Sequence, residues 1–193
     1  MIFTLPEKAR QVEIVVCPAT CYNPFMKLQT LVPQNYDAYF ALRLESLQQC
    51  PNMYATDAND WQNAARETIE KHLLLSEADT APIFGMWHEA ELVGQIGLKP
   101  ESRPTVRHKA SLWGLYVKPA FRRQGIGQAL VAAAIGSARE RPFVEQVRAV
   151  ATLDGEALLH FFTSCGFVEY GREPRAKLYQ GSYYEQAYIW QFL

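Results

Sequence analysis

The stretch that decides the fold is Leu115-Tyr116-Val117-Lys118-Pro119-Ala120-Phe121-Arg122-Arg123-Gln124-Gly125-Ile126-Gly127-Gln128-Ala129-Leu130. Its apolar beginning predicts a strand that ends before Pro119, and a glycine-containing turn then leads into an Ala- and Leu-rich helix over residues 127–140. Glycines at 125 and 127 let a ligand approach the backbone, and free amides at the positive end of a helix dipole suit a pyrophosphate. Arg122 and Arg123 add positive charge beside that place. Two glycines alone are equally consistent with a tight turn that binds nothing.

Two better-known glycine-rich phosphate loops do not fit this stretch. A dinucleotide-binding fingerprint requires a third glycine three positions after Gly127, where the sequence has Leu130. A Walker A loop requires Gly-Lys followed by Ser or Thr, which is absent. The pattern that remains is Arg-x-x-Gly-x-Gly between a strand and a helix.

The hydrophobic pattern on both sides of the loop predicts an alternation of strands and helices. Apolar residues at helical spacing indicate two helices, around residues 36–47 and 61–73, after a strand that starts at Met26. Period-two alternation predicts strands at 83–88 and 92–98, joined by a short polar link into a hairpin, and a third at 110–117. After the helix at 127–140 come a strand at 147–152, a helix at 156–165, and strands at 167–170 and 184–193.

This order of elements predicts an α/β protein with a mixed sheet. The hairpin requires antiparallel neighbours, whereas the strand-helix-strand unit over 110–152 requires a parallel pair. Ligands of such sheets bind where a strand ends and the next helix begins. In this chain that place is the segment from Val117 to Gly127.

The loop resembles the acyl-CoA motif of the GNAT superfamily of N-acetyltransferases. In that superfamily the pattern is Gln/Arg-x-x-Gly-x-Gly/Ala, which Arg122, Gly125 and Gly127 match. The resemblance extends from about Met26 to Leu193 and includes Gly166-Phe167 after a helix, as well as the helical segment 42–47. It implies a GNAT-like fold: a twisted, mixed sheet of six to seven strands, about four helices, and an acyl-CoA cleft between two splayed parallel strands, here 110–117 and 147–152.

The resemblance also implies an activity and a set of binding residues. The implied activity is transfer of an acetyl group from acetyl-CoA to a primary amine of a small molecule or peptide, by direct attack in a ternary complex. Main-chain groups of the strand before the loop hold the pantetheine arm in the superfamily, and amides of the loop hold the pyrophosphate. The corresponding residues of this chain are Leu115, Tyr116, Val117, Arg122, Arg123, Gln124, Gly125, Ile126, Gly127, Gln128 and Ala129.

One position departs from the superfamily pattern. A tyrosine on the last helix usually protonates the leaving thiolate, and counting back from Gly166-Phe167 places Phe162 there. A register shifted by one residue places Phe161 there instead, so the hydroxyl is missing either way. The departure admits an alternative function, an acyl-CoA-binding or sensor module that is catalytically weak or silent.

Other catalytic residues are less determined. The superfamily suggests the Val117 amide as the donor to the thioester carbonyl. Candidates for the base that deprotonates the amine are Glu101 and His108, and Tyr184 is a candidate acid. Each of these three side chains is equally compatible with an ordinary place at a solvated strand end. The helices before residue 75 carry acids and aromatics, which favours a cationic amine as acceptor.

Composition excludes several other functions. The chain has 193 residues with 19 Lys and Arg against 20 Asp and Glu, a formal charge of −1, so we expect neither nucleic acid nor a membrane as partner. Without an apolar run of about 20 residues or a signal sequence, we expect a soluble, cytoplasmic protein. Cys17 and Cys21 lack a second ligand pair, so no metal is expected. Residues 1–25 are expected to be an appendage to a domain at 26–193, and the oligomeric state stays open, with a homodimer as the candidate.

Overall fold

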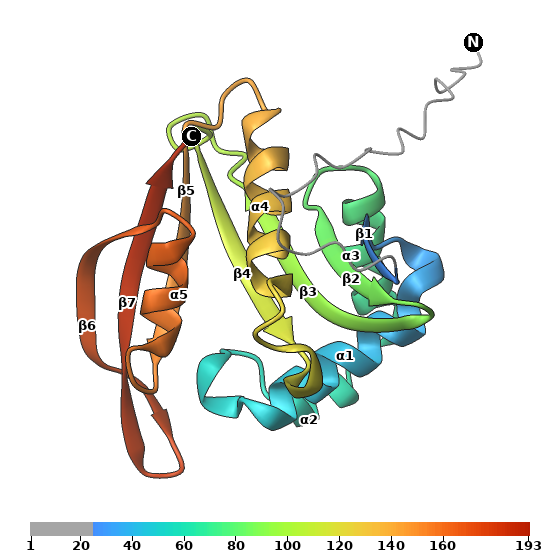
Figure 1. Cartoon of the computed structure of the whole chain (residues 1–193), viewed down its shortest axis with the longest axis horizontal. Coiled ribbons are helices and arrows are strands. Elements are labelled where there is room, and N and C mark those ends of the chain that lie inside the picture. Colours follow the sequence, from blue (N-terminus) through green and yellow to red (C-terminus); the bar gives the residue numbers. More distant parts are fainter. Residues whose placement is uncertain (1–24) are drawn as a thin grey trace.

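The computed structural model describes residues 25–193, which form one mixed seven-stranded sheet with helices on both faces (Figure 1). The strand order is β1-β2-β3-β4-β5-β7-β6, and every neighbouring pair is antiparallel except β4 and β5. The strands are β1 (Met26–Thr30), β2 (Ile83–His88), β3 (Glu91–Pro100), β4 (Lys109–Val117), β5 (Gln146–Leu153), β6 (Val168–Tyr179) and β7 (Ser182–Phe192). The α-helices are α1 (Tyr36–Gln49), α2 (Ala58–Gln62), α3 (Arg66–Glu77), α4 (Ile126–Arg139) and α5 (Ala157–Ser164). The α/β class and the mixed sheet predicted from the sequence are confirmed.

Two hydrophobic cores lie on opposite faces of the sheet. Residues of α4 and α5, such as Leu130 and Phe162, belong to one core, and residues of α1 and α3, such as Leu42 and Leu73, belong to the other. Neighbouring residues of a strand point to opposite faces, and Tyr116 of β4 accordingly packs into the second core while the residues on either side pack against the first. The strand β4 is therefore covered on both faces, by α4 and by α1.

The parallel strands β4 and β5 pair over only part of their length. Three residues pair, from Lys109 opposite Gln146 to Ser111 opposite Arg148, although both strands continue beyond this point. The cause lies on the other edge of β4, where two residues, Gly114 and Leu115, stand opposite the single residue Ile96 of β3. Such a β-bulge bends its strand, and Gly114 adopts the positive φ of +68° that a glycine tolerates best. The bulge thus turns β4 away from β5.

Two details differ from the pattern-based expectations. The predicted second helix is two helices, because α2 ends at Gln62 and α3 begins at Arg66. Asp57 caps α2 by accepting a hydrogen bond from the Asn59 amide at 2.7 Å. The strand β6 runs to Tyr179, well past the predicted residue 170, because Pro174 is tolerated at an irregularity of a sheet edge.

The remaining expectations about the chain concern its first residues and membranes. Of the expected appendage at residues 1–25, residues 1–24 lie outside the described residues, and Cys17 and Cys21 are among them. Within residues 25–193, no helix has both the length and the apolar character needed to span a membrane.

Candidate active site

The loop between β4 and α4 presents a row of backbone amides at the open end of the sheet. Gly125 is the N-cap of α4 with φ +80°, and no side chain caps the helix. The first hydrogen bond of the helix runs from the Ala129 amide to the Gly125 carbonyl at 3.0 Å. Among the described residues, the amides of Gly125, Ile126, Gly127 and Gln128 have no hydrogen-bond acceptor. Unpaired amides at the positive end of a helix dipole are suited to bind an anion.

Two arginines of the loop flank these amides. Arg122 and Arg123 are both exposed, and neither forms an ion pair within residues 25–193. Arg122 donates from Nε to the Val117 carbonyl at 2.9 Å, and its guanidinium lies 5.7 Å from the centre of the Tyr116 ring. Arg123 has a positive φ of +63°, unusual for a residue with a side chain. The loop therefore holds two cations next to the unpaired amides.

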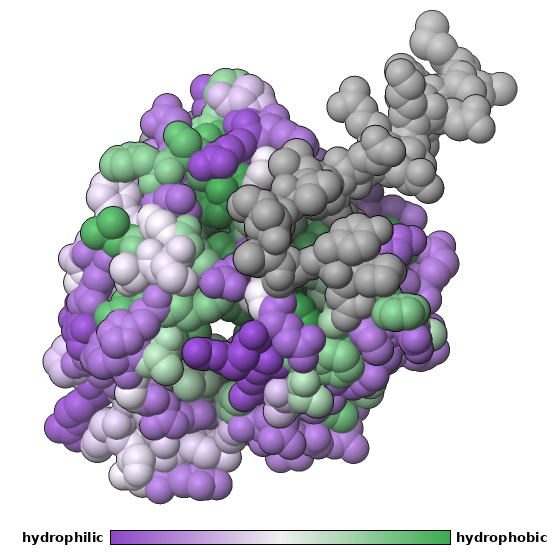
Figure 2. Space-filling model, viewed as in Figure 1, coloured by the Kyte–Doolittle hydropathy of each residue, from purple (hydrophilic) through white to green (hydrophobic). Residues whose placement is uncertain are grey.

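The free edge of β4 supplies main-chain groups next to this loop. The Lys118 amide donates to the Val93 carbonyl of β3 at 2.9 Å, and Val117 stands opposite Gly94. Because backbone groups alternate between the two edges of a strand, the Val117 N–H and C=O face away from β3. They face the side on which β5 has separated, and Figure 2 shows an opening through the molecule in this region, beside hydrophilic residues. These groups can bind a linear polar chain such as pantetheine.

The helix α5 closes the cleft beside the loop. A Cβ atom at Gly127 would lie 3.1 Å from Cε2 of Phe161, a tight contact, so the Phe161 ring lies directly against the first turn of α4. Phe162 instead points into the core, where it is 5% exposed and packs edge-on against Phe167. Of the two sequence registers, the one that assigns Phe161 therefore puts an aromatic ring next to the loop. The hydroxyl is missing there, as the sequence predicted.

The connection between α1 and α2 covers the opposite face of the cleft, which the sequence did not reveal. We call residues 51–54 the 51–54 segment. Its Tyr54 hydroxyl donates to the Leu115 carbonyl of β4 at 2.9 Å, and the Thr152 hydroxyl of β5 contacts the Met53 carbonyl at 3.4 Å. Lys177 of β6 donates to the carbonyls of Asn52, at 2.9 Å, and Tyr54. The segment thus spans the gap between the separated strands.

Burial determines the protonation state of the Tyr54 phenol. It raises the pKa of the Tyr54 phenol to about 12, against the opposing effect of the nearby Arg43 cation. Tyr54 therefore stays protonated at neutral pH and acts as a hydrogen-bond donor.

The predicted catalytic residues fall into two groups in the structure. Tyr184 stands opposite Lys177 on β7, so both side chains lie on the sheet face that the 51–54 segment covers. Glu101 and His108 lie at the other end of β4, where β4 and β5 are still paired. Glu101 forms a 2.7 Å ion pair with Arg148, and the His108 carbonyl accepts from the start of β5. At about 3.3 Å per strand residue, this end is more than about 20 Å from Val117.

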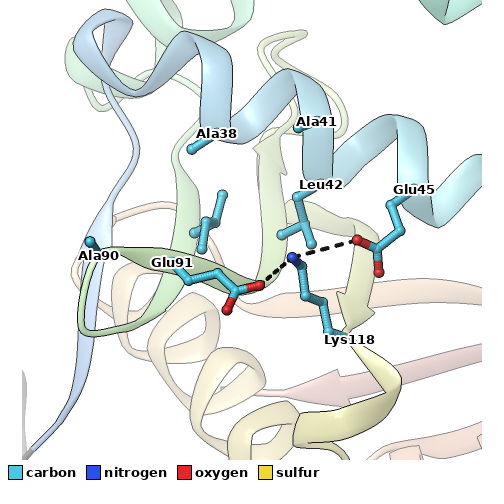
Figure 3. Close-up of a pocket in the computed structure, with 8 residues that line it drawn as sticks. Ala38, Ala41, Leu42, Glu45, Ala90, Glu91 and Lys118 are labelled. Carbon is cyan, nitrogen blue, oxygen red and sulfur yellow. Dashed lines mark hydrogen bonds and ion pairs between the residues drawn. The ribbon is translucent and has the colours of Figure 1, made fainter.

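A pocket of about 230 Å³ lies between α1 and the turn that joins β2 to β3 (Figure 3). The small side chains of Ala38 and Ala41 on α1 leave this volume unfilled. Lys118 lies at the base of the pocket, and its ammonium lies between the carboxylates of Glu91 and Glu45. Glu45 also accepts from the Tyr116 hydroxyl at 2.9 Å. Lys118 follows the same strand as the phosphate loop but does not add its charge there, because two carboxylates hold it on the α1 side.

The comparisons with known proteins agree with this arrangement. The family model described as the acetyltransferase (GNAT) family matches residues 43–167. The human protein N-acetyltransferase 8 is 34% identical over 85 residues, which is 44% of this chain and 37% of that protein. The matched part thus spans little more than a third of this curated relative.

Solved structures share the fold over almost their whole length. An acetyltransferase of the GNAT family from Streptococcus pneumoniae superposes with a TM-score of 0.77 at 18% identity, over 87% of this chain and 99% of that chain. The putative acetyltransferase yncA from Salmonella typhimurium, solved with acetyl-CoA, superposes with a TM-score of 0.75 at 15% identity, over 87% and 94% of the two chains. At these identities the likeness concerns the fold, while the family match includes β4, the loop and α4. The family match is consistent with the separated strands and with the glycine at the N-terminus of α4, and the chain belongs to the acetyltransferase (GNAT) family.

Proposed function

We propose that the chain transfers an acetyl group from acetyl-CoA to a primary amine of a small molecule or peptide, by direct attack in a ternary complex. The observation that carries the proposal is the set of unpaired amides at the start of α4, next to the edge that β4 exposes where it leaves β5. A pyrophosphate fits the amides, and the pantetheine arm fits the free edge of β4. The family membership of the chain supports the same substrate.

Each part of the cleft has a role in this reaction. The amides of Gly125 to Gln128, with Arg122 and Arg123, bind the pyrophosphate. The Val117 N–H donates to the thioester carbonyl and stabilises the negative charge that develops there when the amine attacks. The amine reaches the carbonyl from the face of the 51–54 segment, a C–N bond forms, the C–S bond breaks, and one amine proton ends on the thiolate.

Tyr184 is the proposed proton donor to the thiolate, since it lies on the acceptor face and no tyrosine occupies the position of Phe161 or Phe162. Glu101 and His108 are not part of the proposed machinery because of their distance from Val117. A base is not required to contact the amine directly, because water can carry the proton from a partly open cleft.

Release of free thiol from acetyl-CoA tests the function. The chain is incubated with acetyl-CoA and a broad panel of primary amines, and CoA binding is measured in parallel by calorimetry. Amine-dependent, saturable release supports the enzyme. Saturable CoA binding without release for any amine supports the binding module, and absence of CoA binding contradicts both.

The cytoplasmic location and the homodimer also belong to the proposal. Cell fractionation and light scattering, respectively, test them.

A further inference from the structure

Arg43 is a buried cation for which residues 25–193 supply no counter-ion. This residue of α1 is 6% exposed, yet no carboxylate pairs with it within residues 25–193. In the described part of the chain, its one side-chain hydrogen bond runs from Nη1 to the Ser46 hydroxyl at 3.5 Å, and its guanidinium packs on the Tyr54 ring, 4.4 Å from the ring centre. An arginine carries five N–H donors, and burial of an unpaired charge is unfavourable. Burial accordingly lowers the pKa of Arg43.

The unpaired side of this guanidinium is accessible. The fully enclosed polar atoms without a partner include the Tyr39 hydroxyl and both amide atoms of Gln95, but no nitrogen of Arg43. Nε and Nη2 form no hydrogen bond in the described part of the chain and are not among these enclosed atoms, so the space in front of these two donors is at least partly open. Two donors side by side on a planar guanidinium match the two oxygens of a carboxylate.

This space adjoins the cleft. A Cβ atom at Gly114 would lie 3.7 Å from Nη1 of Arg43, so the guanidinium lies against the bulge that turns β4 away from β5. The next residue, Leu115, accepts the hydrogen bond of Tyr54. Three strand residues, about 10 Å, separate Gly114 from Val117. A carboxylate on Arg43 would therefore lie about 10 Å along β4 from a carbonyl held by Val117, a span that an amino acid with several carbons between its amine and its carboxylate can bridge.

We propose that Arg43 binds a carboxylate of the acceptor, which makes the acceptor class small amino acids with a free primary amine. The inference rests on the proposed acetyl transfer, and it adds the chemical class of the second substrate. Tyr54 holds the guanidinium in place from its ring face while its hydroxyl is fixed on β4. Asp57 and Asp60, two exposed acids of the helical region before residue 75, form no ion pair with Arg43.

The competing explanation is that Arg43 does not contact the substrate and only holds the Tyr54 ring in place. The two explanations differ for uncharged acceptors. A structural arginine affects all amines equally, whereas a carboxylate-binding arginine affects only acceptors that carry the carboxylate.

The first experiment uses the unaltered chain. Glycine, β-alanine and 4-aminobutyrate are each compared with the corresponding primary amide, at saturating acetyl-CoA, by thiol release. We expect at least one acid to exceed its amide in kcat/KM by about 100-fold, as for a charged hydrogen-bonded pair. Acid and amide rates within 3-fold of each other in every pair would overturn the assignment, while leaving the acetyl transfer itself intact.

The second experiment uses Arg43→Gln, with Arg43→Lys as the variant that keeps the charge and Arg66→Gln as the control. Arg66 is an exposed arginine that also lies over a tyrosine ring, 4.0 Å from the centre of Tyr36. We expect Arg43→Gln to lose the preference for the acid, Arg43→Lys to keep part of it, and Arg66→Gln to keep all of it. Equal loss for acids and amides in Arg43→Gln would show a structural role.

Binding provides a measurement that does not depend on turnover. In the presence of CoA, 4-aminobutyrate should raise the melting temperature of the unaltered chain and of Arg66→Gln, but not of Arg43→Gln. This result would support the carboxylate site even if no amine released thiol, so failure of the proposed function and failure of the carboxylate site are distinguishable. An equal rise in Arg43→Gln, or no rise in any of the three proteins with any of the acids, would overturn the site.

Discussion

Replacing Gly125 by alanine should weaken CoA binding much more than it weakens the fold. Gly125 has φ +80° and ψ −4° at the start of α4. An alanine in this left-handed conformation costs roughly 1–2 kcal/mol. For a domain of this size, each kcal/mol lowers the melting temperature by about 2–4 °C. The variant should therefore fold, with a melting temperature a few degrees lower.

The effect on CoA follows from the amides that the turn orients. If alanine relieves its strain by rotating toward negative φ, the amides of Gly125 and Ile126 turn away from the direction that α4 gives them. A hydrogen bond to a charged group contributes about 1.5–3 kcal/mol, so the loss of one such bond weakens binding roughly 10- to 100-fold. Calorimetric titration with CoA measures this change directly.

Gly136→Ala is the matched control. Gly136 lies within the same helix, and a Cβ atom there would have no neighbour within 4 Å. Alanine in a helix interior is more favourable than glycine by about 1 kcal/mol, so this variant should melt a few degrees higher and bind CoA normally. If Gly125→Ala lowered the melting temperature but bound CoA within 3-fold of the unaltered chain, the amides at the start of α4 would not be the pyrophosphate site.

Three shorter predictions concern packing and charge. A Cβ atom at Gly97 would lie 2.1 Å from the Trp113 ring, so Gly97→Ala should destabilise the fold by about 3 kcal/mol or more, measured by urea unfolding; a loss below 1 kcal/mol would contradict the packing. Phe162→Tyr should cost about 1–3 kcal/mol of stability because it buries a hydroxyl without a partner, and unchanged stability would mean that the ring is not enclosed. Arg123→Gln should weaken CoA binding and make it less sensitive to salt, whereas Arg107→Gln, at the distant end of β4, should change neither; equal behaviour of the two variants would contradict the placement of the loop.

The phosphate loop could be predicted from the sequence because its determinants are local. A glycine needed for positive φ, a proline that ends a strand and an Ala-rich helix all act within a few residues of one another. The sequence therefore predicted the glycine turn at Gly125, which is the N-cap of α4 with positive φ in the structure, while its role in pyrophosphate binding stays a prediction. Gly127 was identified for an incomplete reason, since the structure shows that its missing side chain makes room for Phe161.

The acceptor side could not be predicted because it depends on contacts between distant parts of the chain. Lys177 reaches the Asn52 carbonyl across 125 residues, and Tyr54 reaches the Leu115 carbonyl across 61. Sequence periodicity does not identify which strand lies opposite which loop. It also treats Arg43 as an ordinary surface residue of a helix, because a charged side chain is rarely buried without a partner.

Gly114 connects the two sides of the proposed site. The bulge at this residue bends β4, and this bend frees the edge on which the Val117 groups can bind the pantetheine arm. The Arg43 guanidinium packs against the same residue, because a Cβ atom at Gly114 would lie 3.7 Å from Nη1. An interior glycine in a strand pattern is the one sequence signal that could have indicated this feature. The same bulge therefore bends β4 away from β5 and contacts the unpaired Arg43 cation. The backbone of β4 would then fix the distance between the bound thioester and the carboxylate of the acceptor, whichever amino acid is bound.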